Sequence, residues 1–241
     1  MILGCYYYVW YSKTERHWDE TVVHNPILDR YDSRDPNVIK KHLKMMIEAG
    51  IDLVIISFWG PGSFEDSAAQ TVVKVIEKEQ PRLRFCLIIE RNKFLDHDYL
   101  DQKYFQSPNY FLFDGKPLVV TYEKPPRDDR MYIVRYLSYN MKIRHVMPAY
   151  DERMLGRSTE HYLPRLNGLT YRILFKLAKL GNPRLIFIVS WNEYHEQTTI
   201  SPTKEYGFKY LDLTKELSGV KYRTRNCFKT CRMSVFEESK S

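Results

Sequence analysis

Twelve residues late in the chain bring together side chains that can do acid–base chemistry. The segment 185–196 reads LIFIVSWNEYHE, in which an apolar run is followed by an indole, an amide, an imidazole and two carboxyl groups. Glu193 and Glu196 are three residues apart, so both can face one cleft where the chain leaves a strand. If their surroundings differ, their pKa values separate, and one carboxyl can act as acid while the other acts as base. This cluster predicts an acid–base site rather than a set of solvated loop charges.

Apolar runs that end on polar or aromatic residues recur along the chain. Such a run is typical of a strand buried on both faces of a parallel sheet. Strands are predicted at 2–10, 51–58, 84–90, 116–122, 143–150 and 185–189, with weaker candidates at 131–136 and 220–222. Helices are predicted at 36–49, 66–79, 168–180 and 202–217. The first helix has Asp35 as N-cap, Pro36 at its first position and Gly50 to close it.

The alternation of strands and helices predicts one parallel α/β domain. A barrel collects the carboxyl ends of its strands on one face, whereas an open sheet spreads them along an edge. Because polar or aromatic residues end strand after strand, we expect an α/β fold with a single, compact (β/α)8-type (TIM) barrel. The catalytic domain is expected to span 1–217. Residues 218–241 form a basic C-terminal tail that could complete the barrel.

The composition favours some classes of partner over others. The chain has 241 residues, with 37 Lys or Arg against 30 Asp or Glu, which gives a net charge of +7. The basic residues are scattered among acidic ones, so no nucleic-acid partner is expected. No apolar stretch is long enough to span a membrane, and the first residues lack the pattern of a signal peptide. We therefore expect a cytoplasmic protein without a membrane partner.

The four cysteines do not have the spacing of a metal site. Cys5 and Cys86 lie inside apolar runs and are expected to pack as small hydrophobic side chains. Cys227 and Cys231 could pair within the tail, but an isolated pair at this spacing is weak evidence. We expect neither a bound metal nor a cofactor.

Seven short motifs occur in the order seen in glycoside hydrolase family 99, and the chain resembles that family over about residues 1–217. The most specific of them lies at 191–198, WNEYHEQT, which is similar to the WNEWHEGT of the family. The motifs are YYVWY at 7–11, RHW at 16–18, YDS at 31–33, SFWG at 57–60, IE at 89–90, PAYD at 148–151 and SWNEYHE at 190–196.

The resemblance implies a fold, a reaction and roles for individual residues. The family contains endo-α-1,2-mannosidases and mannanases with a (β/α)8 barrel, thought to act with retention through a 1,2-anhydro sugar. By position, Glu193 matches the base that deprotonates the sugar 2-hydroxyl, and Glu196 matches the acid that protonates the leaving oxygen. The expected partner is an oligosaccharide or polysaccharide. The expected substrate-binding residues are Tyr8, Tyr11, His17, Trp18, Trp59, Glu90, Tyr150, Asp151, Trp191, Asn192 and His195.

Three tryptophans, Trp18, Trp59 and Trp191, are expected to offer flat apolar faces to sugar C–H groups. The chain also departs from the family pattern. Gln197 stands where the family has Gly, and Ser201 stands where it has a Glu before Pro. The loss of a carboxylate at 201 predicts a cleft that tolerates acidic glycans. The segment between 122 and 143 is shortened.

Two other functions remain open at this point. One is a glycosyltransferase-like or non-catalytic carbohydrate-binding relative with the same barrel. The other is a metalloenzyme that uses His17, Glu193, His195 and Glu196, although these residues lack the HExxH spacing of a zinc site.

Overall fold

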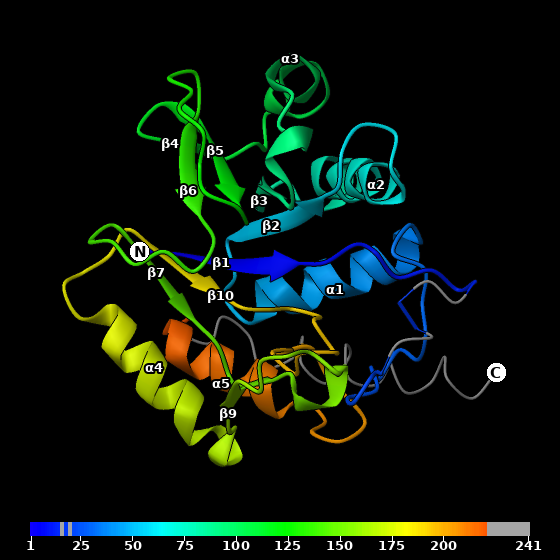
Figure 1. Ribbon diagram of the computed structural model, residues 1–241, viewed down its shortest axis with the longest axis vertical. Helices are drawn as coiled ribbons and strands as arrows, with labels where there is room; N and C mark the ends of the chain where they lie inside the picture. Colours follow the sequence, from blue (N-terminus) through cyan, green and yellow to red (C-terminus); the bar gives the residue numbers. More distant parts are fainter. Residues whose placement is uncertain (15–16, 19–20, 221–241) are drawn as a thin grey trace.

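Parallel strands form a curled sheet at the centre of the computed structural model (Figure 1), which describes residues 1–14, 17–18 and 21–220. Within those residues seven strands are parallel, and their order across the sheet is β6-β5-β3-β2-β1-β10-β7. The short strand β4 adds to β5 in the antiparallel sense. The strands are β1 (Ile2–Tyr7), β2 (Leu53–Phe58), β3 (Arg84–Ile89), β4 (Leu112–Phe113), β5 (Lys116–Thr121), β6 (Tyr132–Arg135), β7 (Ile143–Val146) and β10 (Leu185–Ile188).

The strand order is that of a barrel followed around its circumference, except that β6 and β7, at the two ends of the order, are not paired among the described residues. We call this gap the open seam. β10 pairs directly with β1, whereas β6 and β7 share no ladder in the described part of the chain. Their ends still approach: the ring centroid of Tyr136, which follows β6, lies 6.4 Å from that of His145 in β7, and His145 Nδ1 lies 3.0 Å from the Ser138 carbonyl oxygen. The fold is therefore (β/α)8-like, but the closed eight-stranded barrel that we expected is not observed. The weak strand candidate at 131–136 is confirmed as β6, whereas the candidate at 220–222 reaches into residues outside the described range.

The seam follows from the short segment between β5 and β7. A helix normally separates consecutive parallel strands, and only turns and bends link β5, β6 and β7. Elsewhere helices cover the sheet: α1 (Pro36–Glu48), α2 (Phe64–Glu79), α4 (Leu169–Lys179) and α5 (Lys209–Ser218). Shorter elements are η1 (Asn92–Phe94), α3 (His97–Leu100), η2 (Asp101–Phe105), η3 (Arg153–Leu155), η4 (Leu166–Gly168) and the β8 (Tyr150–Asp151) and β9 (Tyr162–Leu163) pair.

Local signals set the helix starts where capping residues are present. Asp35 accepts a hydrogen bond from the Asn37 amide at 2.9 Å, as its N-cap position requires. Three predicted boundaries are wrong by three or more residues, and the first is the strand predicted at 2–10, which ends at Tyr7. The last helix begins at Lys209 rather than 202, because 202–208 fold into turns in which Thr203 bridges Gly207. The strand predicted at 143–150 ends at Val146, and Tyr150 pairs with Leu163 instead.

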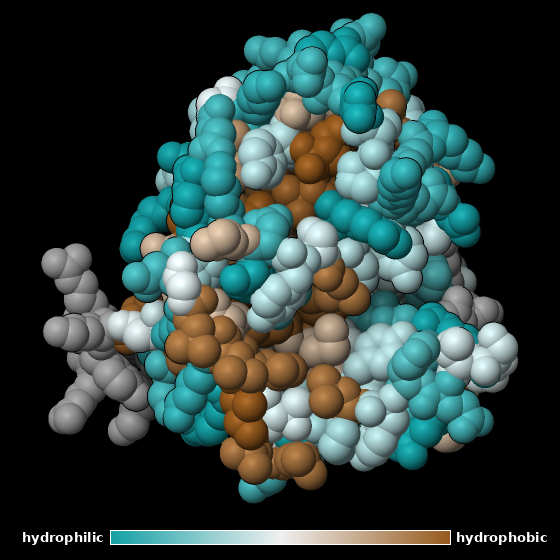
Figure 2. All heavy atoms as spheres, turned by 60° about the vertical axis from the view of Figure 1, so that its left-hand side comes forward, coloured by the Kyte–Doolittle hydropathy of each residue, from teal (hydrophilic) through white to brown (hydrophobic). Residues whose placement is uncertain are grey.

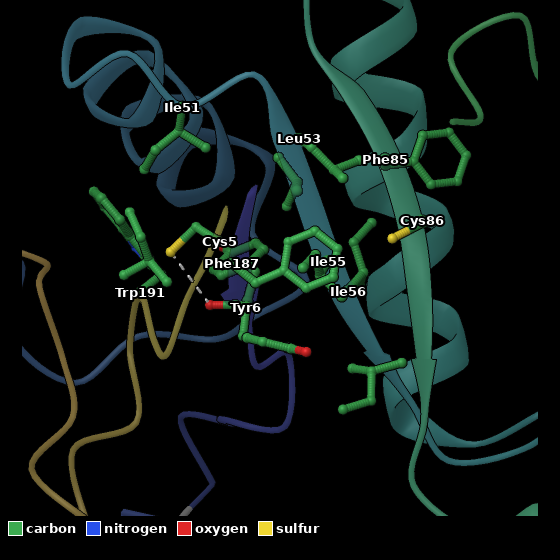
Figure 3. Packing of buried hydrophobic residues seen from close by; sticks show 14 of the residues in the cluster. Cys5, Tyr6, Ile51, Leu53, Ile55, Ile56, Phe85, Cys86, Phe187 and Trp191 are labelled. Carbon is green, nitrogen blue, oxygen red and sulfur yellow. Dashed lines mark hydrogen bonds between the residues drawn. The ribbon is translucent and has the colours of Figure 1, made fainter. Parts of the chain in front are cut away.

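The core is continuous from the sheet to the helices. Every residue of β2 and β10 is buried, and so are the unpaired Cys5 and Cys86, as expected for small hydrophobic side chains. Figure 3 shows part of this core, with side chains of β1, β2, β3 and β10 packed together. Gly4 is needed there, because a Cβ at this position would lie 2.8 Å from the Phe187 ring. No helix among the described residues has the length and apolar character needed to cross a membrane.

Candidate active site

The loop after β10 folds back on itself and presents both carboxyl groups of the motif. Ser190 anchors it: its amide donates to the Thr198 carbonyl at 3.0 Å, and its hydroxyl accepts from the Glu193 amide at 2.9 Å. The Trp191 amide donates to the Tyr6 carbonyl at 2.8 Å, which ties the loop to β1. Because these bonds fix the backbone on both sides of Glu193, its side chain is held in a defined position.

Asn192 connects the ends of β10 and β1 through its amide group. Its Oδ1 accepts from the Tyr8 amide at 2.9 Å, and its Nδ2 donates to the Tyr8 carbonyl at 2.7 Å and to the Tyr31 hydroxyl at 2.9 Å. Asn192 is fully buried, and its carbonyl accepts from the Tyr11 hydroxyl at 2.9 Å. Asn192 and Tyr11, both expected to bind substrate, also hold the loop that carries Glu193 against the end of β1.

His195 is the partner of Glu193. Glu193 Oε1 accepts from the His195 amide at 3.0 Å and lies 2.8 Å from His195 Nδ1. His195 Nε2 in turn lies 2.9 Å from the His17 carbonyl oxygen. Both ring nitrogens thus lie against oxygen atoms, which fixes the orientation of the imidazole beside Glu193. Glu193 Oε2 has no hydrogen-bond partner among the described residues, so this oxygen is available to a ligand.

Glu196 is held by an arginine from the segment after β8. Arg157 Nη1 donates to Glu196 Oε1 at 2.5 Å and lies 3.2 Å from Glu152 Oε2. Burial and the nearby charge of Glu193 raise the pKa of Glu196, and Arg157 opposes that rise. The sequence analysis missed Arg157, which lies between two short strands in a segment without a recognisable periodicity.

Glu90 follows β3 and completes a cluster of three carboxyl groups. Burial raises its pKa to about 8, and the charges of Glu193 and Glu196 add to the effect. Its Oε1 is buried without a hydrogen-bond partner in the described structure. At neutral pH Glu90 is therefore mainly protonated, and its carboxyl group can donate a hydrogen bond to a ligand.

Glu90 should destabilise the folded protein as the pH rises. The folded chain keeps a proton on Glu90 up to about pH 8, whereas the unfolded chain releases it near 4.5, so stability is lost across that interval. We expect Glu90→Gln to be more stable than the wild type by a few kcal/mol at pH 8. The gain should shrink towards zero at pH 4. Urea unfolding at both pH values measures this, with the exposed Glu160→Gln as control; an equal gain at both values would contradict it.

Aromatic side chains line the approach to the carboxyl groups. Tyr8 stacks on Trp10 with ring centroids 4.3 Å apart, and Trp10 contacts Trp59 at 6.4 Å. Trp59 also borders a hollow of about 540 Å³ whose other lining residues are Arg91, Lys93, Phe94 and Glu123. Trp59 is one of the three predicted sugar-stacking tryptophans, and Arg91, which lines the same hollow, directly follows Glu90 in the chain.

The expectation for the other two tryptophans is not met. Trp18 and Trp191 are 1% and 0% exposed, so neither offers a free face to a sugar. Trp18 stacks on Tyr11 at 4.1 Å and donates from Nε1 to the Tyr31 carbonyl, while Trp191 packs against His42. Aromatic residue type and loop position could not distinguish these packing roles from ligand contact.

The segment around β8 contributes less directly than expected. Tyr150 donates from its hydroxyl to Glu152 Oε2 at 2.7 Å, and burial followed by the charge of Glu196 raises its pKa. Asp151 is bound at 2.9 Å by two nitrogens of Arg153, so its carboxylate is already occupied.

Tyr136 was missed by the sequence analysis, and Tyr122 was recognised only as the aromatic end of the strand predicted at 116–122. Their rings stack at 5.2 Å, and burial followed by the charges of Glu196 and Glu90 raises the pKa of Tyr122. They lie after β6 and β5, at the open seam of the sheet. The predicted strand at 131–136 was the signal that could have pointed to Tyr136.

The two departures from the family motif have different consequences in the structure. Ser201 is buried, and its hydroxyl lies 3.0 Å from the Tyr194 hydroxyl and 2.9 Å from Thr199 Oγ1. A residue held in this way can act on the cleft only through its neighbours, and the expectation that position 201 tunes substrate charge stays a prediction. Gln197 has φ = 59°, a left-handed conformation in which glycine is favoured over residues with a Cβ.

Glycine at position 197 should therefore give a more stable protein than alanine. We expect Gln197→Gly to be more stable than Gln197→Ala by about 1 kcal/mol, because alanine keeps the Cβ that the left-handed conformation disfavours. At the exposed helical position Lys74 the order should reverse by a similar amount. Chemical denaturation of the four variants checks both orders; alanine more stable than glycine at 197 would contradict the argument.

The proposed metal chemistry has no ligand set among the residues described. No group of three or more His, Cys, Asp or Glu side chains in that part of the chain is arranged to hold a metal ion. His17 approaches His195 through its backbone carbonyl.

Comparison with known proteins agrees with this geometry. The model of glycosyl hydrolase family 99 matches residues 9–142, more than half of the chain. The glycoprotein endo-alpha-1,2-mannosidase of Mus musculus is 22% identical over 87% of this chain and 70% of its own length. That of Xenopus laevis is 20% identical over 87% and 72%. The mouse alignment runs over 324 positions, so the relative has insertions that this shorter chain lacks.

The fold is similar to that of solved family members. The GH99 endo-alpha-mannosidase from Bacteroides thetaiotaomicron superposes with a TM-score of 0.75 and 19% identity, covering 89% of this chain and 96% of that chain. Its complex with Bis-Tris propane gives a TM-score of 0.75 and 20% identity, covering 97% and 98%. The family match, the likeness in fold and the carboxyl cluster lead to one conclusion: this chain belongs to glycosyl hydrolase family 99 and is a glycoside hydrolase.

Proposed function

We propose that this enzyme cleaves α-mannosidic bonds inside glycans, with retention of configuration and through a 1,2-anhydro sugar. The observation that carries the proposal is the arrangement of Glu193, whose Oε1 is occupied by His195 while Oε2 is left for a ligand. Glu196 and Glu90 lie within electrostatic reach of it. The mannosidase activity named for the mouse and Bacteroides proteins supports the choice of sugar.

In the first step Glu193 accepts the proton of the 2-hydroxyl. In an α-mannoside this axial oxygen lies anti to the leaving group, so it can attack C1 as the bond to the leaving oxygen breaks. Glu196 donates its proton to that oxygen, which gives a neutral alcohol and the anhydro sugar. General acid–base help of this kind is typically worth about 10²- to 10⁴-fold in rate.

The second step restores both catalytic groups. A water molecule attacks C1 of the anhydro sugar and gives a proton to Glu196, while Glu193 returns its proton to O2. C1 is inverted in each step, so the released sugar keeps the α configuration. No atom of the enzyme is covalently bound to the substrate in this sequence.

Around this pair, Glu90 donates a hydrogen bond to a sugar hydroxyl, because its raised pKa keeps it protonated near neutral pH. Tyr8 and Trp59 line the path of the glycan, and Tyr150 lies beside Glu196. His195 and Asn192 position Glu193. We place the catalytic domain at 1–217 and treat 218–241 as an appended basic tail.

One observation favours a relative that binds glycans without cleaving them. The ion pair of Arg157 with Glu196 favours the ionised form of the carboxyl that should act as acid. In the enzyme, entry of the leaving-group oxygen between these two side chains would separate them.

A screen of α-mannan and α-mannosyl oligosaccharides with product analysis tests the proposal. We expect shorter oligosaccharides with a new reducing end, and none from β-linked mannans. Binding of the α-mannosyl glycans without cleavage, equal in the wild type and Glu193→Gln, would instead identify a binding protein.

A further inference from the structure

The outer face of α4 carries a stripe of exposed aliphatic side chains. Leu169, Ile173 and Leu177 follow one another at helical spacing, and Leu166 and Leu180 extend the stripe at its two ends. All five are 47–65% exposed. Figure 2 shows an apolar band over the lower part of the face on which α4 lies in Figure 1. Large exposed apolar patches of this kind mark interaction sites.

The same stripe is bordered by cations. Arg172, Lys176 and Lys179 recur at spacings of four and three residues, so they lie along one side of it. Arg172 pairs with Glu216 of α5, and Lys179 donates to the Leu217 carbonyl, so both are held at the α5 side. From 161 to 192 the sequence has five Lys or Arg and no Asp or Glu.

The apolar surface continues at the end of α4. Met141 is 81% exposed. Its neighbour Lys142 accepts, through its carbonyl, from the amides of Arg184 and Leu185, so this turn lies beside the chain that follows Leu180. The surface therefore combines aliphatic side chains with a basic border over a helix and an adjoining turn.

These properties distinguish between possible occupants. A second copy of the chain would bring the same basic border against itself. The tail at 221–241 carries six Lys or Arg and two Glu, so its charge is also of the same sign. Protein interfaces are enriched in aromatic residues, methionine and arginine and depleted in lysine. The stripe on α4 is purely aliphatic and has Lys176 and Lys179 beside it, a composition typical of helices on lipid surfaces.

We infer that α4 docks on the surface of an anionic lipid bilayer, with Leu169, Ile173 and Leu177 buried among the lipids and Lys176 at the headgroups. The expectation that this protein has no membrane partner rested on the absence of a spanning segment, which says nothing about a helix lying on the surface. Such docking combines the burial of apolar side chains with electrostatic attraction to anionic lipids. Each of these contributes a moderate part of the binding free energy when it acts alone.

Vesicle co-sedimentation of the full chain tests the inference. We expect binding to vesicles of phosphatidylglycerol mixed with phosphatidylcholine, and much weaker binding to pure phosphatidylcholine. Because each half-exposed side chain contributes roughly ten-fold to binding, the triple replacement of Leu169, Ile173 and Leu177 by Ser should weaken binding by about 1,000-fold. Lys176→Glu should also weaken it, as should salt, which shortens the screening length from about 10 Å at 0.1 M to about 3 Å at 1 M.

Leu112→Ser is the matched control, since Leu112 is 53% exposed but lies on β4. Equal binding by the wild type and the triple variant would overturn the inference. So would a concentration-dependent dimer that the triple variant abolishes, because the stripe would then bind a second copy. The readout does not involve hydrolysis, so its failure would leave the proposed function untouched.

Discussion

Replacing Glu193 by Gln is expected to lower kcat on an α-mannosyl glycan by about 10²- to 10⁴-fold with little change in KM. Gln keeps the size of the side chain, but it cannot accept a proton from the sugar 2-hydroxyl. The amide would also face His195, whose amide and Nδ1 both lie against Oε1 in the wild type.

Steady-state kinetics on the glycan that the wild type cleaves fastest would measure this loss. The exposed Glu160→Gln serves as control and should keep wild-type kcat. A Glu193→Gln variant with kcat within a few-fold of the wild type would rule out Glu193 as the base.

The second large effect is expected at Glu196, and it should depend on the leaving group. Glu196→Gln cannot protonate the leaving oxygen, so a natural glycan should lose about 10²- to 10⁴-fold in kcat/KM. An activated aryl α-mannoside, whose leaving group needs little protonation, should lose much less. Equal losses on the two substrates would contradict the acid role.

The pH dependence gives the same assignment a separate check. Burial and Glu193 raise the pKa of Glu196 above its ordinary 4.5, and the acid must be protonated to act. Wild-type kcat/KM should therefore fall as the pH rises through that raised pKa, and Glu196→Gln should lack this alkaline fall. The acid role of Glu196 is tested by whether the alkaline fall in kcat/KM is present in the wild type and absent in Glu196→Gln, and not by the pH at which it occurs.

The sequence predicted the parts of the fold that depend on local signals. Asp35 and Pro36 start α1 as expected, because capping involves only neighbouring residues. Closure of the barrel is different: it depends on whether β6 and β7, separated by a short link, meet edge to edge. Apolar runs reveal strands but not which edges pair, so the shortened segment between 122 and 143 was visible in the sequence but did not by itself reveal the open seam.

The candidate site was predictable where residue type determines the role. Glu90, Glu193 and Glu196 follow apolar strands, and the structure places them within electrostatic reach of one another. Arg157 was not predictable, because its contact with Glu196 spans 39 residues and no local pattern marks it. Trp191 shows the opposite error: it belongs to the motif, yet it lies fully in the core.

Glu90 Oε1 is buried without a hydrogen-bond partner among the described residues, which lowers the stability of the folded protein but leaves the oxygen available to a ligand. A buried acceptor without a hydrogen bond destabilises the folded state, and such groups are concentrated at functional positions. Because burial raises the pKa of Glu90, its replacement by Gln should stabilise the protein most at alkaline pH.

The central claim is that Glu193 acts on the sugar 2-hydroxyl, and a substrate lacking that proton tests it most directly. An α-mannosyl oligosaccharide should be compared with its 2-O-methyl derivative at the ring whose bond is cleaved, and with the 3-O-methyl derivative as control. The account predicts that the 2-O-methyl substrate binds but is not hydrolysed, whereas the 3-O-methyl substrate is. Hydrolysis of the 2-O-methyl substrate at a rate near that of the parent glycan would contradict it.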